Sequence, residues 1–132
     1  VVAWATGVFR TSVPHPILSV VGEEGASKST LARFLVQLVD PRTPLLRSEP
    51  KDEEALSVAA ANGWLLAYDN LSGIPPWLAD TFCRVVTGGG SSARKKYTDD
   101  EEHVFEARRP IILTGIDDPS ARGDFLSRVL PI

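Results

Sequence analysis

Cysteine, histidine and methionine are scarce in this sequence. Its 132 residues include one cysteine, two histidines and no methionine. A single cysteine, Cys83, excludes an internal disulfide framework, and we expect a buried, reduced thiol in a cytoplasmic protein. His15 stands between two prolines with no second ligand nearby, so we expect an exposed side chain and no metal site there.

Long apolar runs and an excess of one charge are also missing. No apolar stretch approaches the ~20 residues that a membrane-spanning helix needs, so we expect no membrane partner. With 14 Lys and Arg against 17 Asp and Glu, the formal net charge is -3, and any contact with nucleic acid requires a local basic patch. There is no initiator methionine and both ends are apolar, so we expect residues 1–132 to be one domain excised from a longer protein.

The stretch 22–30 carries the most specific motif. A short β-rich run, 17–21, precedes it, and a helical pattern, 31–39, follows. Strand, glycine-bearing loop, Lys-Ser and helix is the order that a phosphate-binding P-loop requires. In the usual pattern, G-x-x-x-x-G-K-[ST], a second glycine stands where this chain has Ser27. The predicted ATP-binding residues are Gly22, Glu23, Glu24, Gly25, Ala26, Ser27, Lys28, Ser29 and Thr30.

The chemistry of such a loop follows from its backbone. Successive N–H groups and a helix N-terminus converge on one point and form an anion site. Lys28 is predicted to reach the β- and γ-phosphates, and the Ser29 hydroxyl to bind Mg²⁺. The alternative is an ordinary strand-to-helix turn that contains glycine.

A second stretch, 64–70, is apolar until it ends at Asp69 and Asn70. It predicts a buried strand that delivers a carboxylate at its carboxyl end, where open α/β sheets bind ligands. Asp69 is therefore predicted to face the glycine loop and to share the metal ion with Ser29. The alternative is an aspartate that caps the next segment.

The remaining periodicities predict further helices and strands. The helix 31–39 is predicted to face the core through Leu31, Phe34, Leu35 and Leu38. Helices are also predicted over 51–61 and 76–86, and a short edge strand at 45–46. The strand 110–114 ends in Thr114, whose hydroxyl is predicted either to face the γ-phosphate and attacking water or to bond the following turn. A last strand is predicted over 129–132.

Between these elements, residues 93–108 predict a hairpin with a basic arm and an acidic tip. The basic arm suggests a contact with DNA, in which cationic side chains bind phosphates and an aromatic ring stacks on bases. A solvated hairpin whose charges neutralise one another is the alternative. The possible nucleic-acid contacts are Arg94, Lys95, Lys96 and Tyr97.

In this order the parts resemble the ATPase core of AAA+ and superfamily 3 helicase proteins, especially the helicase–primase ATPases of phages and mobile elements. The resemblance covers about 17–132. It implies a three-layer α/β P-loop fold with a mainly parallel five-stranded sheet of order 5-1-4-3-2. It also implies a β-hairpin insertion before the strand that carries the sensor-1 residue.

The resemblance further implies roles for single residues. The Walker A loop would be 22–30, Walker B 65–70 and sensor 1 Thr114. Arg128, or else Arg122, would be an arginine finger that reaches the nucleotide of a neighbouring subunit in a ring of identical chains. This chain departs from the pattern at Ser27, at Thr114, where asparagine is familiar, and at Asn70, where a second acid is frequent. An amide can orient water but cannot accept its proton.

These observations lead to one main hypothesis and two alternatives. The main hypothesis is ATP binding and Mg²⁺-dependent hydrolysis coupled to work on DNA. The alternatives are a nucleotide-gated regulatory module with little turnover and a P-loop kinase acting on a small molecule. The predicted catalytic residues are Lys28, Asp69, Asn70, Thr114 and Arg128.

Overall fold

The computed structural model describes residues 1–23, 25, 27–88, 108–115 and 123–132. Residues 93–107 of the predicted hairpin, with the possible DNA contacts at 94–97, therefore lie outside the described residues, as does Arg122. The helices are α1 (Val2–Gly7), α2 (Lys28–Val39), α3 (Glu53–Asn62), α4 (Pro76–Thr87) and α5 (Gly123–Leu126). The strands are β1 (Ile17–Val20), β2 (Leu66–Tyr68), β3 (Ile111–Thr114) and β4 (Val129–Pro131).

The strands form one parallel sheet in the order β2-β3-β1-β4. Leu18 of β1 aligns with Ile112 of β3 and with Leu130 of β4, and Ile112 also aligns with Ala67 of β2. Because all four strands are parallel, their carboxyl ends meet at one edge of the sheet, where ligands of open α/β sheets bind.

The described residues form four strands rather than the five predicted. Near the expected edge strand at 45–46, the chain makes only one isolated parallel bridge, between Arg47 and Tyr68. Pro41, Pro44 and Pro50 surround this segment. Proline has no N–H for the strand ladder, which accounts for a single bridge where a strand was expected.

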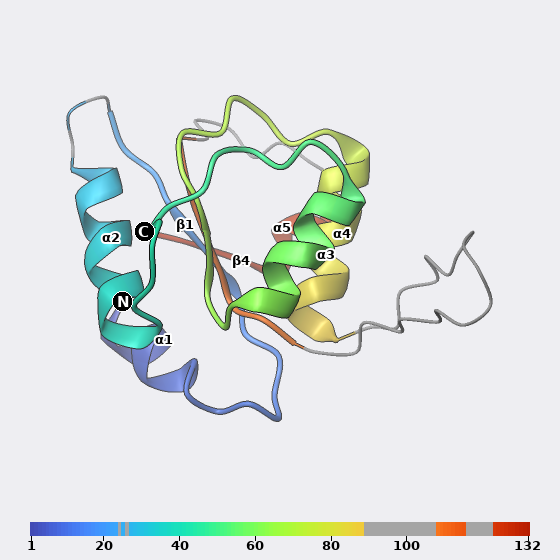
Figure 1. Ribbon diagram of the computed structural model, residues 1–132. Coiled ribbons are helices and arrows are strands. Elements are labelled where there is room, and N and C mark those ends of the chain that lie inside the picture. Colours follow the sequence, from blue (N-terminus) through green and yellow to red (C-terminus); the bar gives the residue numbers. More distant parts are fainter. Residues whose placement is uncertain (24, 26, 89–107, 116–122) are drawn as a thin grey trace.

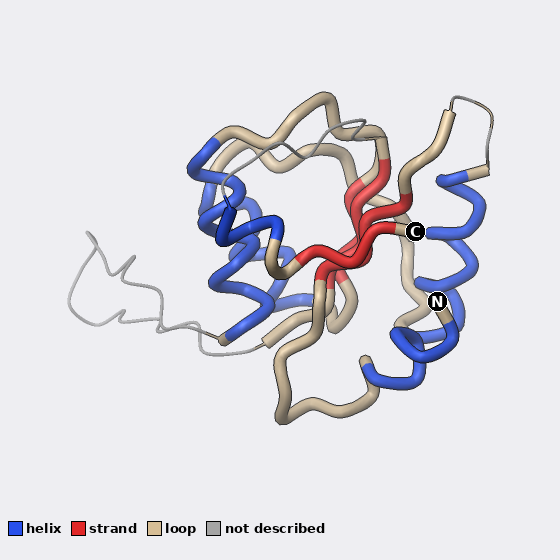
Figure 2. The backbone as a smooth tube through the Cα atoms, turned by 180° about the vertical axis from the view of Figure 1, so that it is seen from behind, coloured by secondary structure: helices blue, strands red, loops and turns tan. Residues whose placement is uncertain are grey.

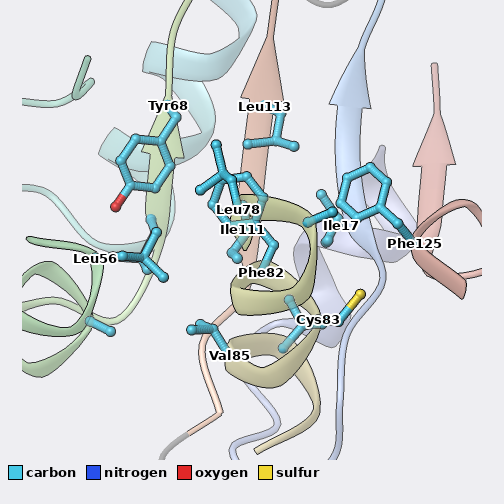
Figure 3. Close-up of a cluster of buried hydrophobic side chains, with 14 of the residues drawn as sticks. Ile17, Leu56, Tyr68, Leu78, Phe82, Cys83, Val85, Ile111, Leu113 and Phe125 are labelled. Carbon is cyan, nitrogen blue, oxygen red and sulfur yellow. The ribbon is translucent and has the colours of Figure 1, made fainter. Parts of the chain in front are cut away.

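Helices cover both faces of the sheet and make a three-layer α/β structure. Figure 1 shows α1 and α2 on one side of the sheet and α3, α4 and α5 on the other, and Figure 2 shows the same layers from behind. Each face has its own buried core. The larger core includes Tyr68, Leu78, Phe82 and Phe125 (Figure 3). β1, β2 and β3 are thus buried between two apolar layers, as continuous apolar strands predict. The edge strand β4 is largely exposed, with Leu130 40% exposed.

The buried face of α2 differs from the predicted one. Phe34 and Leu38 are 66% and 67% exposed, whereas Ala32, Leu35 and Val36 are buried. Apolar residues lie on several sides of this helix. Their spacing alone therefore does not decide between two rotations of the helix about its axis that differ by about one residue position.

His15 is also placed differently from the prediction. Its side chain is buried, and its Nε2 lies 2.9 Å from the Arg10 carbonyl oxygen, to which an Nε2–H donates. The ring packs edge-on against Trp64. Burial lowers the pKa of His15, against a smaller raising effect of this hydrogen bond. The predicted burial of Cys83 is confirmed. In the described part of the chain, no helix is both long and apolar enough to span a membrane.

Candidate functional site

The glycine loop connects β1 to α2 through backbone conformations that few residues adopt. Gly25 has a φ of 84°, and Ser27, at the position of the usual second glycine, has a φ of 64°. The left-handed region costs a residue with a Cβ about 1 kcal/mol or more. The first turn of α2 follows directly, because Leu31 N–H donates to the Ser27 carbonyl oxygen at 3.0 Å. Residues 24 and 26 lie outside the described part of the loop.

Lys28 is the first residue of α2 and folds back across the loop. Its Nζ donates to the Gly22 carbonyl oxygen at 2.5 Å. The ammonium group therefore lies over the start of the loop, close to the N-terminus of α2. This combines a positive side chain with the partial positive charge of a helix N-terminus.

Three side chains from three different elements meet at the carboxyl edge of the sheet. Oδ1 of Asp69, directly after β2, accepts hydrogen bonds from two hydroxyl groups. Ser29 of α2 donates at 2.6 Å, and Thr114 at the end of β3 also donates at 2.6 Å. We call Ser29, Asp69 and Thr114 the carboxylate hub. It joins residues that lie 40 and 45 positions apart in the sequence.

The hub also fixes the backbone that follows β2. Asn70 N–H donates to the Thr114 hydroxyl oxygen at 3.0 Å, and Leu71 N–H donates to the Thr114 carbonyl oxygen at 2.9 Å. Gly115 has a φ of 92°, and a Cβ there would lie 2.6 Å from Asn70 Cα. The ends of β2 and β3 can approach this closely only because residue 115 is a glycine.

The hub offers suitable ligands for Mg²⁺. Its Ser29 hydroxyl and Asp69 carboxylate are oxygen donors, which Mg²⁺ prefers, and protein Mg²⁺ sites usually complete their octahedron with water and phosphate oxygens. Asp69 is half-buried, and Ser29 lies in the first turn of α2. The oxygen donors of Ser29 and Asp69 therefore fit a magnesium ion.

Arg128, another predicted catalytic residue, lies apart from the hub. The Arg128 carbonyl oxygen accepts from Ile17 N–H at 2.7 Å, at the start of β1 and β4. Arg128 is thus at the opposite edge of the sheet from the glycine loop, beside a cleft of about 240 Å³. Asn70 directly follows Asp69 in the sequence. Its backbone N–H bonds the hub, and the residue itself is exposed to solvent.

Sequence reasoning missed Arg47 as a neighbour of this site. Asp69 N–H donates to the Arg47 carbonyl oxygen at 2.9 Å, so the bridging segment holds the backbone of the hub aspartate from the other side. No motif marks Arg47. Its position depends on one backbone bridge, which the sequence pattern does not reveal.

Comparisons with known proteins give a single family. No curated protein and no solved structure matched the chain. The sequence model of a family described as "Actinomycete integrative conjugative element replication protein" matches residues 1–132. This match extends over the full length of the chain, and the chain therefore belongs to the actinomycete integrative conjugative element replication protein family.

Proposed function

We propose that this domain binds ATP and Mg²⁺ at the glycine loop and hydrolyses the nucleotide to drive a step in the replication of a mobile element. The family match supplies the replication context. The nucleotide chemistry is argued from the residues around the carboxylate hub. DNA is the partner that this context favours.

The observation that carries the proposal is the pair of 2.6 Å hydrogen bonds that bring Ser29 and Thr114 to Asp69. An ordinary strand-to-helix turn has no need of a carboxylate from a second strand and a hydroxyl from a third. A magnesium-nucleotide site needs such an arrangement beside its phosphate loop.

The strand order supports the same interpretation. If the Arg47 bridge is counted as the remnant of a second strand, the five positions read β4, β1, β3, β2 and then the bridge. Numbered along the chain, this is 5-1-4-3-2, the order that the resemblance to AAA+ and superfamily 3 ATPases implies.

Each residue then has a defined task. Backbone N–H groups of the loop and the N-terminus of α2 would hold the phosphates, and Lys28 would turn from the Gly22 carbonyl oxygen to the β- and γ-phosphates. Magnesium, when bound, would neutralise charge on the phosphate oxygens. Asp69 and Ser29 would hold it, while Thr114 keeps the carboxylate oriented. Asn70 would orient the attacking water.

Arg128 would act on the nucleotide of another subunit. It lies at the edge of the sheet opposite its own glycine loop, since its carbonyl oxygen pairs with the first residue of β1. A finger role for Arg128 therefore requires a ring or dimer, and turnover should then rise with protein concentration.

A second candidate function is a nucleotide-gated module with slow turnover. The observation that favours it is the amide of Asn70, which follows Asp69 at the position where a second acid is frequent in such ATPases. An amide there cannot accept the proton of the attacking water. Tight binding with little phosphate release would identify this function.

The test is phosphate release from ATP with and without single-stranded DNA. The wild type should turn over and be stimulated by DNA, while Lys28→Ala should lose about 100-fold or more because it removes a charge that stabilises the transition state. Arg33→Gln, which removes an exposed charge elsewhere on α2, is the matched control. Equal turnover in Lys28→Ala and the wild type would overturn the proposal, and transfer to an added acceptor in place of water would identify a kinase.

A further inference from the structure

The outer edge of β2 holds buried polar atoms that have no hydrogen-bond partner in the part of the chain that the structure describes. They are Nε and Nη1 of Arg42, Nε of Arg47 and the hydroxyl oxygen of Tyr68. We call these three residues the β2-edge cluster. Buried polar groups in folded proteins are nearly always paired, and each exception calls for an explanation such as a missing ion.

A backbone bridge places two of the three side chains next to each other. Arg47 N–H donates to the Ala67 carbonyl oxygen at 2.9 Å, which aligns Arg47 with Tyr68 in a parallel bridge. Aligned residues of neighbouring parallel strands present their side chains on the same face. Arg42 reaches the same edge, where its Nη2 donates to the Leu65 carbonyl oxygen.

Tyr68 is directed toward this edge although its ring belongs to the core. The residue is 2% exposed, and its ring packs against Phe82 with centroids 5.8 Å apart. Figure 3 shows its hydroxyl pointing to the outer side of β2, away from Ile111 and Leu113 on β3. The polar end of a buried ring is thus aimed out of the apolar core.

The cluster carries more positive than negative charge. Asp40 is the one carboxylate paired with it in the described residues, through Oδ2, 3.4 Å from Arg42 Nη1. That same oxygen already accepts from Trp64 N–H at 2.7 Å and from Leu65 N–H at 3.0 Å. Arg47 has no acidic partner within the described part of the chain.

Protonation states keep all three groups available as donors. Burial raises the pKa of Tyr68 to about 12, against the lowering effect of the two arginines. The phenol therefore stays neutral and keeps its proton near pH 7. Burial also lowers the pKa of Arg42, against the raising effect of Asp40, but guanidinium groups stay charged in proteins.

We propose that the β2-edge cluster is a binding site for a phosphate-class oxyanion. Two guanidinium groups and a phenol supply donors and charge of the kind that phosphate oxygens accept, and arginine binds such groups in fork geometry. Arg42 and Arg47 are both half-buried, so the cluster reaches the surface through these two side chains. This site is separate from the glycine loop and does not depend on its function.

The experiment measures thermal unfolding in a Lys28→Ala background, which weakens phosphate binding at the glycine loop. Inorganic phosphate is titrated against chloride at constant ionic strength. A bound anion raises the stability of the folded state until the site is saturated. Phosphate also stabilises proteins in general, because it is excluded from their surface, and this effect keeps rising with phosphate concentration. We expect a saturable rise in Tm.

Two variants and one control decide the outcome. Arg47→Gln and Tyr68→Phe should each raise the apparent Kd for phosphate about tenfold or more, since each removes one donor. Arg33→Gln, which removes an exposed charge on α2, should leave it unchanged. If all three variants respond to phosphate as the parent does, the proposal is wrong.

A second arm identifies the source of the phosphate group. A short single-stranded oligonucleotide replaces inorganic phosphate in the same four proteins. Saturation by the oligonucleotide at a much lower concentration of phosphate groups than inorganic phosphate requires would assign the site to a nucleic-acid backbone. This response should be lost in Arg47→Gln and Tyr68→Phe. Saturation by inorganic phosphate alone would assign it to a free anion. No saturable response in either arm would overturn the proposal.

Discussion

The carboxylate hub and the β2-edge cluster lie on either side of the end of β2, and they differ in how their polar groups are hydrogen-bonded. In the hub, Asp69 Oδ1 accepts from two hydroxyls, and Thr114 also satisfies Asn70 N–H. In the cluster, four buried polar atoms have no hydrogen-bond partner among the described residues. A satisfied network stabilises the fold, whereas unpaired donors reduce stability until a ligand pairs them. The end of β2 thus lies between a fully hydrogen-bonded network, the carboxylate hub, and a candidate anion-binding site, the β2-edge cluster.

The largest expected effect on stability comes from placing a side chain at Gly115, where the ends of β2 and β3 approach each other. Gly115→Ala would place a Cβ 2.6 Å from Asn70 Cα at a φ of 92°. We expect the free energy of unfolding to fall by about 3 kcal/mol or more, from backbone strain and overpacking. Gly7→Ala is the control, since a Cβ at Gly7 meets nothing within 4 Å. Equal stability of the two variants in urea unfolding would show that the ends of β2 and β3 are not tightly joined.

A single hydroxyl of the hub gives the next largest effect. Thr114→Val keeps the shape of this 2% exposed side chain, but it removes one donor to Asp69 and the acceptor of Asn70 N–H. We expect a loss of about 2 kcal/mol in the free energy of unfolding. Thr114→Ser should recover most of it, because it restores the hydroxyl. A valine variant as stable as the wild type would contradict the hub as a satisfied network.

Removing a hydroxyl from the cluster should have the opposite sign. Tyr68→Phe deletes a buried oxygen that has no hydrogen-bond partner within the described residues, so in chloride buffer we expect the free energy of unfolding to rise by about 1 kcal/mol. The comparison with Thr114→Val is direct, because each change removes one buried hydroxyl. Destabilisation by Tyr68→Phe in the absence of added phosphate would mean that the tyrosine hydroxyl is paired within the protein.

The smallest effect concerns the glycine loop. Ser27 has a φ of 64°, so Ser27→Gly should relieve backbone strain, partly offset by the greater freedom of glycine in the unfolded chain. We expect a gain of about 0.5 kcal/mol in the free energy of unfolding. Ser27→Ala retains a Cβ and serves as the control, with no gain expected. A loss of stability in Ser27→Gly would indicate that the serine hydroxyl supports the loop.

The sequence predicted the parts of this structure that depend on short-range order. The strand that ends at Asp69 is apolar until its acid, and the loop before Lys28 is a local motif. Because parallel strands end at a common edge, the pattern also indicated that Asp69 would lie near Ser29. The resemblance to AAA+ and superfamily 3 ATPases implied a three-layer α/β fold, and the parallel sheet does have helices on both faces.

Other features depend on packing that no local pattern records. The rotation of α2, which leaves Phe34 exposed, is decided by how the helix fits the sheet. The burial of His15 requires the Arg10 carbonyl oxygen and Trp64, 49 positions further along the chain, to meet in space. The β2-edge cluster depends on the register of one bridge at Arg47. In each case the sequence pattern allows more than one arrangement, and tertiary packing selects one of them.

The most direct measurement of the central claim is a calorimetric titration of ATP, with and without Mg²⁺, into the wild type and Asp69→Asn. The neutral amide keeps the size of the side chain while removing the charge that would hold the metal. We predict that Mg²⁺ tightens ATP binding about tenfold or more in the wild type and has little effect in Asp69→Asn, with equal affinities in the absence of metal. The same Mg²⁺-dependent gain in both proteins would contradict a magnesium-nucleotide site at the carboxylate hub.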